Sequence, residues 1–303
     1  MASFDSRPPL GPVRVAFVFQ GGGSLAAPQV GMLWALTEAG IRPDLVVGSS
    51  AGALNAVAFA SDPSSKGLDQ LEDVWASVRR RHVAPFSVRA LLAAFTGHGE
   101  GLVSDAALRV LLERAAHAPT LRETAVPAHV VATDLASGEP VVLSDGDTVA
   151  ALLASSAFPG LYRSVPIGRR LLVDGGVSAD VPVLQAEALG ATVSYVLPAA
   201  TWDVALPLPR RPLPQAYHAL RQILESAARR DIAAAQGRVH VLPAPNTRIA
   251  NPIDFRDTAG LIEEGYRLAT EWLAHRAAPA IIPAPPAPSL LDGSMTTRVA
   301  SAS

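Results

Sequence analysis

Residues 45–56 read LVVGSSAGALNA, and this stretch decides the class of fold. Its first three residues form an apolar run rich in β-branched side chains, which predicts a short buried strand. Small residues over 51–60 predict a helix that begins directly after the strand. Between the two lies the pattern G-x-S-x-G, and a strand–turn–helix junction of this kind holds its serine at the apex of a sharp turn. Ser50 is that serine, and Gly48 and Gly52 let the chain fold back on either side of it.

Ser50 is therefore the candidate nucleophile. It lies at the N-terminus of a predicted helix, whose dipole favours developing negative charge. The same pattern also fits a plain glycine–serine turn that binds a phosphate or no ligand, so its neighbours must decide between these uses.

A second strand–helix unit precedes this one. Residues 13–19 are apolar except for Arg14, glycines follow at 21–23, and apolar residues return at helical spacing over 27–39 before Gly40 ends the segment. Two such units in succession predict a βαβ arrangement. The sheet should therefore be mostly parallel, with helices on both faces.

The glycine loop of this first unit is the candidate oxyanion hole. Gly21, Gly22, Gly23 and Ser24 bring backbone N–H groups together close to the candidate nucleophile. A dinucleotide cradle is a rival use, but the G-x-G-x-x-G spacing fails because Ala26 stands at its last glycine. A glycine turn without a ligand is the third alternative.

A candidate base comes later in the chain. Residues 171–176 read LLVDGG, so an apolar strand ends in an acid and two glycines. Asp174 lies at the strand end, where sites of α/β proteins gather, and Gly175 and Gly176 form the loop behind it. Partial burial raises the pKa of a carboxylate, which would let Asp174 take the Ser50 proton directly. An ordinary Asp-Gly turn is the plain alternative.

Three other residues compete for the role of base. His240 and His275 follow Asp174 in the chain order of a Ser–Asp–His triad. His240, however, lies within a predicted strand and His275 at the end of a predicted helix. Asp134 precedes a Ser-Gly pair and is expected to shape a hairpin turn.

The remaining pattern predicts further alternation of helices and strands. Helices are expected over 67–78, 88–95, 105–116, 149–156, 182–189, 215–236 and 257–275, and strands over 128–133, 141–143, 171–173, 192–197 and 239–242. The helix over 215–236 is expected to carry its Arg and Glu residues on its outer face.

These elements predict one α/β domain over residues 13–276. Residues 1–12 are expected to form a flexible N-terminus. Residues 277–303 are rich in Pro, Ala and Ser without periodicity, which is typical of a disordered tail.

Composition excludes several classes of function. Of 303 residues 49% are hydrophobic and 17% charged, so the bulk of the chain is not disordered. The net charge of −2 gives no basic field for a nucleic-acid partner. The absence of Cys excludes disulfides, thiolate metal sites and Cys nucleophiles. No signal peptide or run of about 18 apolar residues is found, so a cytoplasmic location is expected.

Five ordered motifs resemble the patatin-like lipid acyl hydrolases. They are GGGSLAAPQVGML at 21–33, VVGSSAGALNA at 46–56, VATDLASGE at 131–139, ASSAFPGLY at 154–162 and LLVDGGVSADVPV at 171–183, and IDFRDTAGLIEEGY at 253–266 resembles the closing segment of the family. The resemblance implies a three-layer αβα sandwich with a mostly parallel central sheet. It implies a dyad of Ser50 and Asp174 without a catalytic His, oxyanion donors at Gly21 to Gly23, and hydrolysis of acyl esters, often of phospholipids, without cofactor or metal.

The sequence departs from the family pattern at two places. Leu25 and Ala26 stand where the family often has a cation and a glycine, so a positive charge beside the oxyanion site is missing. Asp180 stands where Asn is usual before Val-Pro. An ionised Asp accepts hydrogen bonds but cannot donate them, so a structural hydrogen bond near the dyad loop is expected to change.

The predicted function is that of a serine lipid acyl hydrolase, with a lipid or ester as its substrate. The alternatives are a Ser–Asp–His esterase that uses His240 and a lipid-binding member of the fold with weakened turnover. Arg79 to Arg81 precede the apolar segment 88–95, which suits peripheral contact with an anionic membrane or a basic helix end packed on the core. The oligomeric state is left open.

Overall fold

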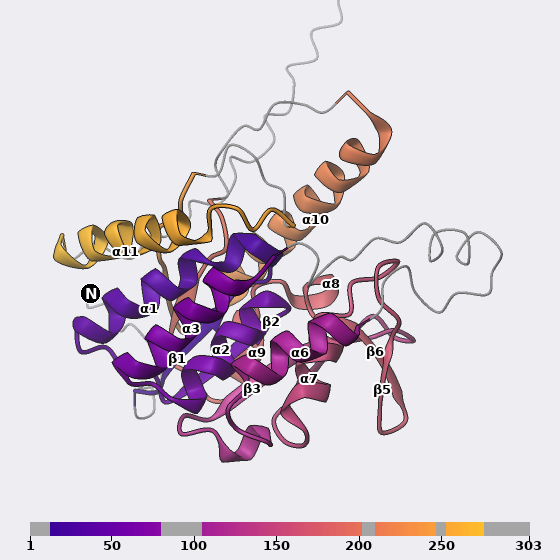
Figure 1. The fold of residues 1–303 in the computed structure, drawn as a ribbon, viewed down its shortest axis with the longest axis horizontal. Helices are drawn as coiled ribbons and strands as arrows, with labels where there is room; N and C mark the ends of the chain where they lie inside the picture. Colours follow the sequence, from indigo (N-terminus) through magenta and orange to yellow (C-terminus); the bar gives the residue numbers. More distant parts are fainter. Residues whose placement is uncertain (1–12, 80–104, 202–209, 247–252, 276–303) are drawn as a thin grey trace, which may run out of the picture.

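The computed structural model describes residues 13–79, 105–201, 210–246 and 253–275 (Figure 1). The predicted flexible segment 1–12, the predicted tail 277–303 and the predicted helix 88–95 lie outside the described residues.

An eight-stranded sheet forms the centre of the described structure. Its strands are β1 Val15–Phe19, β2 Leu45–Ser49, β3 Ala128–Asp134, β4 Pro140–Leu143, β5 Val165–Ile167, β6 Arg170–Asp174, β7 Val193–Leu197 and β8 Arg238–Val241. Their order is β5-β6-β3-β2-β1-β7-β8, and β4 pairs with β3. The pairs within β3-β2-β1-β7-β8 are parallel, whereas β4, β5 and β6 join antiparallel.

Helices cover both faces of this sheet (Figure 1). They are α1 Pro28–Glu38, α2 Ala51–Ser61, α3 Ser65–Ser77, α6 Ala106–Ala115, α7 Thr148–Ser155, α8 Gly176–Ala179, α9 Val183–Ala188, α10 Pro212–Ala234 and α11 Thr258–Ala274, with short 3-10 turns η1 Gly23–Ala26 and η2 Leu121–Glu123. One core cluster joins the sheet to α1, α2, α3, α6, α7 and α11. A second cluster joins the other face to α8, α9 and α10. The predicted three-layer α/β architecture is confirmed.

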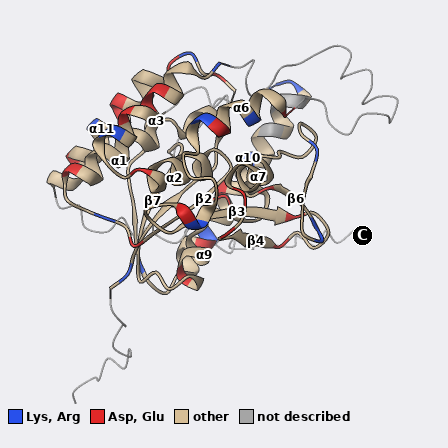
Figure 2. Ribbon diagram, turned by 60° about the horizontal axis from the view of Figure 1, so that its bottom comes forward, with Lys and Arg blue, Asp and Glu red and all other residues tan. Residues whose placement is uncertain are grey.

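Strand β1 shows why both faces are buried. Phe17 and Phe19 belong to the first core cluster, while Ala16 and Val18 belong to the second. Successive side chains of a strand point to opposite faces, so a strand between two helical layers is apolar at every position. In Figure 2 the outer helices α3 and α11 accordingly carry several charged residues.

Helices α1 and α11 lie side by side across the outer layer (Figure 1). Glycine allows this close approach at two positions. A Cβ atom on Gly31 would overlap the carbonyl oxygen of Ile262, and one on Gly265 would overlap that of Pro28. The two backbones therefore contact each other directly, without side chains between them.

The centre of the sheet fixes the place of the site. Strand β1 pairs in parallel with β2, and Phe19 lies opposite Gly48. The loops that leave the carboxyl ends of these two strands are therefore neighbours. The glycine loop follows β1 and the Ser50 turn follows β2, as the sequence pattern predicts.

Candidate active site

Ser50 occupies a strained turn between β2 and α2. Its φ of 53° and ψ of −127° make it the one non-glycine residue with positive φ in the described part of the chain. A Cβ atom on Gly48 would come within 2.6 Å of the Gly52 carbonyl oxygen, and one on Gly52 would overlap the Gln20 backbone. Only glycine at both positions lets the helix approach the strand this closely, which is the geometry of a nucleophile elbow.

The Ser50 hydroxyl donates a hydrogen bond to Asp174. The distance from Ser50 Oγ to Asp174 Oδ2 is 2.8 Å, and the other carboxylate oxygen accepts from Gly176 N at 2.8 Å. Asp174 is 5% exposed. Burial raises the pKa of Asp174 to about 6, against the opposing effect of its hydrogen bonds from Ser50 and Gly176. Asp174 thus pairs with the hydroxyl, and its pKa lies well above the ordinary value of an Asp.

Strand pairing explains how residues so far apart in sequence meet. Strand β3 pairs with β2 through Ser49 and Val131, and with β6 through Ala132 and Asp174. Two consecutive residues of β3 therefore pair with the last residue of β2 and the last residue of β6, which brings these strand ends together. Gly175 allows the tight turn after β6, because a Cβ atom there would overlap the carbonyl oxygen of Val131.

Ser155 supports the turn, although no sequence argument singled it out. The Ser50 N–H donates to Ser155 Oγ at 2.8 Å, and the Ser155 hydroxyl donates to Val131 O at 2.6 Å. The carbonyl of Ser155 also accepts from Gly175 N at 3.1 Å. This residue at the end of α7 thus links the Ser50 turn to the loop of Gly175 and Gly176 after β6. Its place in the ASSAFPGLY motif was the available signal.

The glycine loop offers fewer donors than its sequence suggests. Gly21 N donates to the carbonyl oxygen of Asp180 at 3.1 Å, so this N–H group is already bonded. Gly22 and Gly23 have φ values of 151° and 60°, which favour glycine. Within the described residues, their N–H groups donate to no protein acceptor. Ser24 follows them as a buried residue of η1.

Asp180 joins the glycine loop to the loop behind Asp174. Its Oδ2 accepts from Gln20 Nε2 at 2.7 Å, and Gln20 Oε1 accepts from Ala199 N at 2.9 Å. Burial and then the charges of Asp174 and Glu225 raise the pKa of Asp180 to about 7, while the Gln20 hydrogen bond acts the other way. Asp180 thus acts as a hydrogen-bond acceptor at this position.

A buried polar network holds the glycine loop from behind. Gln29 Nε2 donates to Gln20 O at 2.8 Å and to Leu197 O at 2.9 Å. Asn55 Nδ2 donates to Gln29 Oε1 at 2.9 Å, and Trp75 Nε1 donates to Asn55 Oδ1 at 2.8 Å. Each of these buried side chains has partners, so the network fixes α1, α2 and α3 relative to the loop.

A cavity of about 760 Å³ opens beside Ser50 and Asp174. Its lining is mostly apolar and includes Leu54, Trp75, Val78, Leu108, Leu112 and Phe255. The volume and the apolar wall suit an acyl chain. Four charged side chains line it within the described residues, namely Asp174, Asp180, Arg221 and Glu225.

The expectation for helix α10 is wrong at two positions. Arg221 and Glu225 lie in the cavity wall, with side chains 13% and 11% exposed, instead of on an outer face. They are four residues apart and form an ion pair of 2.6 Å between Nε and Oε1. Sequence pattern alone reads Arg and Glu as solvated, because it cannot show that their charges pair on a buried side of the helix.

The histidines considered for a triad lie elsewhere. His240 stacks on Tyr195 with ring centroids 4.9 Å apart, and burial lowers its pKa. His275 is exposed after α11. No histidine lines the cavity in the described residues. Asp134 accepts from Ala136 N at 2.9 Å and shapes the turn between β3 and β4, as expected.

Of the basic cluster predicted to contact a membrane, the structure describes only Arg79. Arg79 donates to the carbonyl oxygens of Ala76 and Val78 and so caps α3. The other two arginines of the basic cluster lie outside the described residues. No described helix is long and apolar enough to cross a bilayer.

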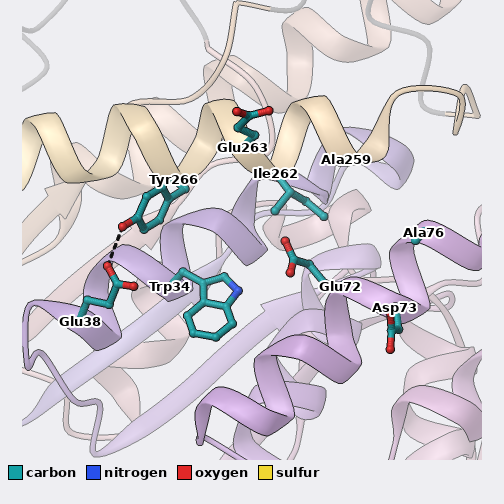
Figure 3. A pocket seen from close by; sticks show the side chains of 9 residues that line it. All are labelled: Trp34, Glu38, Glu72, Asp73, Ala76, Ala259, Ile262, Glu263 and Tyr266. Carbon is teal, nitrogen blue, oxygen red and sulfur yellow. Dashed lines mark hydrogen bonds between the residues drawn. The ribbon is translucent and has the colours of Figure 1, made fainter.

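A second pocket, of about 510 Å³, lies on the outer layer between α1, α3 and α11 (Figure 3). Its carboxylates are Glu38, Glu72, Asp73 and Glu263, and Tyr266 donates to Glu38 at 2.7 Å. None of its residues lines the Ser50 cavity. The described residues contain no group of three or more His, Asp or Glu arranged to hold a metal ion.

Comparison with known proteins identifies a family whose model matches this chain. The model of the family described as patatin-like phospholipase matches residues 17–187. An uncharacterised NTE family protein of Mycobacterium tuberculosis is 29% identical over 170 residues, which cover 56% of this chain and 44% of that protein. Human patatin-like phospholipase domain-containing protein 6 is 26% identical over 193 residues, which cover 62% of this chain and 14% of that protein. The chain thus spans less than half the length of these relatives.

Solved structures show weaker similarity. VipD from Legionella pneumophila gives a TM-score of 0.49 at 15% identity, covering 88% of this chain and 67% of that one. Human GIVD cytosolic phospholipase A2 gives a TM-score of 0.38 at 14% identity, covering 70% and 43%.

Proposed function

The chain belongs to the patatin-like phospholipase family, and on this premise we propose that it is a serine lipid acyl hydrolase with a Ser50–Asp174 dyad. One observation carries the proposal. A serine in a strained turn donates a 2.8 Å hydrogen bond to a buried carboxylate at the wall of a large apolar cavity. A positioned base activates a hydroxyl nucleophile, and the cavity beside it suits the chain of an acyl ester.

In the first half of the reaction, ionised Asp174 accepts the proton of Ser50 as Oγ attacks the ester carbonyl carbon. The carbonyl oxygen becomes an oxyanion, and the N–H groups of Gly22 and Gly23 are the proposed donors to it. One such donor is worth about 3 kcal/mol in the transition state. Collapse of the intermediate breaks the ester bond. The leaving alcohol takes the proton from Asp174, and the acyl group stays on Ser50.

In the second half, Asp174 accepts a proton from water, whose oxygen attacks the acyl-enzyme. The same donors hold the second oxyanion. Its collapse releases the fatty acid, and the proton returns from Asp174 to Ser50. The pKa of about 6 suits this double role, because the group is mostly ionised at neutral pH yet basic enough to accept a proton.

A fluorophosphonate probe tests the proposal, because it labels activated serines. We expect labelling of the whole chain, lost in Ser50→Ala and reduced in Asp174→Asn. Each variant should lose more than about 10³-fold in kcat on a phospholipid. Ser77→Ala, on the outer helix α3, is the control and should label normally. Absence of labelling in the unaltered chain would instead support a binding protein.

The alternative triad is tested with the histidines. His240→Ala and His275→Ala should retain most of the hydrolytic activity, since neither residue lines the cavity. A loss of more than about 10³-fold in either variant would favour a triad over the dyad.

A further inference from the structure

Arg221 is the cation in the wall of the Ser50 cavity among the residues that the structure describes. It lies on α10, which contacts α8 and α9 on the second face of the sheet. Its side chain is 13% exposed, whereas the Arg side chains of the other described ion pairs are at least 50% exposed. Among the arginines of the described ion pairs, Arg221 therefore has the most buried side chain.

The guanidinium uses only part of its hydrogen-bonding capacity. Nε donates to Glu225 Oε1 at 2.6 Å, and Nη1 is buried without a partner. A guanidinium carries five N–H donors in a planar fork, and this fork matches two oxygens of a phosphate or carboxylate. Within the described residues, Glu225 contacts the fork at Nε alone, so the two terminal nitrogens lack an anionic partner.

The position of the pair relates it to the dyad. Glu225 and Asp180 both line the Ser50 cavity, and the charge of Glu225 contributes to the raised pKa of Asp180. Asp180 in turn bonds to Gln20 and Gly21 at the glycine loop. Arg221, paired with Glu225, thus lies in the wall of the same cavity as Asp180 and the glycine loop. A ligand that contacts both Arg221 and the glycine loop would need an anionic group at one position and an ester group at another.

We propose that Arg221 binds the phosphodiester oxygens of a glycerophospholipid whose acyl ester lies at Ser50, and that Glu225 holds Arg221 in place until the lipid enters. This inference rests on the proposed function. It also assigns a cation to a cavity whose glycine loop carries Leu25 and Ala26 at the positions where the family often has a cation and a glycine. Arg221 could instead bind the carboxylate of the released fatty acid, and the test below distinguishes this result.

The test measures binding, so that it does not depend on turnover. A short-chain diether glycerophosphocholine and the matching diether glycerol, which lacks the phosphate, are titrated as monomers onto the full chain. We expect the phosphate compound to bind about 10- to 100-fold more tightly. In Arg221→Gln/Glu225→Gln this preference should fall close to one. The double variant removes both charges, so that no buried carboxylate is left unpaired.

Two further variants keep the test decisive. Arg267→Gln removes an arginine that pairs with Glu271 at 2.6 Å on the exposed surface of α11, and it should keep the preference. Glu225→Gln alone frees Arg221 and should increase the preference, which gives an answer even if thermal unfolding shows the double variant to be misfolded.

Three results would overturn the inference. They are equal binding of the two diethers by the unaltered chain, an unchanged preference in the double variant, and Arg221-dependent binding of free hexanoate without preference between the diethers. A failure of the proposed function has a different signature. In that case fluorophosphonate labelling is absent while the phosphate preference and its dependence on Arg221 persist.

Discussion

At the scale of single residues, the proposed mechanism requires Asp174 to be ionised before Ser50 can react. Only the ionised carboxylate accepts a proton, and the pKa of Asp174 is raised to about 6 by burial. We expect kcat/KM for a soluble p-nitrophenyl ester to rise about tenfold per pH unit below about 6 and to level off above it. Initial rates from about pH 4.5 to about pH 8.5 check this. A rate independent of pH below about 6 would mean that another group acts as the base.

Asp180 gives a second prediction, for stability. Its folded-state pKa of about 7 lies above its ordinary value of 3.8. The folded protein therefore binds this proton more tightly than the unfolded chain, and stability is lost as pH rises from 3.8 to about 7. Asp180→Asn keeps an acceptor for Gln20 and removes this loss.

We expect the variant to have a higher Tm than the unaltered chain at about pH 8, with a difference that shrinks toward about pH 4. Thermal unfolding at several pH values measures the effect. Asp145→Asn, in an exposed pair with Arg122 that is 2.8 Å long, is the control and should change Tm little. The same Tm difference at every pH would show that Asp180 remains ionised throughout.

At the scale of elements, the sequence pattern predicts those strands and helices whose formation depends on residues close together in the chain. Strand β2 and helix α2 follow from an apolar run, a glycine turn and a run of small residues, which act within a few positions of each other. Strand β5 was not predicted, because Val165–Ile167 has three residues with Pro166 between them, and its pairing with β6 defines it. The prediction that Arg221 lies on an outer face is wrong, because the burial of a charged side chain depends on its ion-pair partner and on the other elements that enclose the cavity.

The contact between α1 and α11 gives a prediction at this scale. A Cβ atom on Gly265 would overlap the Pro28 backbone, so Gly265→Ala must push the helices apart. We expect a loss of about 1–3 kcal/mol in the free energy of unfolding. Gly260→Ala on the same helix is the matched control, because its new methyl meets only the side chain of Asp257.

The control should be neutral or stabilising by up to about 1 kcal/mol, since Ala is the better helix former. Denaturant unfolding of the three proteins provides the comparison. Equal stability of Gly265→Ala and the control would mean that the two helices separate without cost.

At the scale of the whole molecule, the partnership of Ser50 and Asp174 shows what the residues alone could not settle. The sequence identified each as a candidate, but Asp134 and His240 also fitted the role of base. The position of Asp174 at a predicted strand end before two glycines favoured it, and the family resemblance then implied its pairing with Ser50, but neither showed the two side chains in contact. The reason is physical: the two residues meet through the register of β3 with β2 and β6, and register depends on long-range pairing that no local pattern encodes.

The cavity also has an apolar border drawn from the loop after α7 and from helices α8 and α10. Phe158, Val177 and Ile223 line it and are 39%, 51% and 63% exposed. Exposed apolar side chains gathered at a lipid-sized cavity favour contact with an aggregated substrate. We expect the rate on a short-chain phospholipid to rise when its concentration passes the point of micelle formation.

Phe158→Ser should reduce this rise about fivefold, because less apolar surface enters the micelle. Leu135→Ser is the control, since Leu135 is 54% exposed but does not line the cavity. Rates measured on both sides of the micelle threshold compare the two. An equal reduction in both variants would assign the effect to general surface hydrophobicity.

The long separation between the two members of the dyad has a consequence for biosynthesis. Ser50 and Asp174 are 124 positions apart, and β6 must pair with β3 before they meet. A polypeptide still emerging from the ribosome therefore contains Ser50 before Asp174 has been synthesised. In the proposed mechanism, hydrolysis requires that β6 has been synthesised and has paired with β3, so a product truncated before β6 is expected to lack this activity.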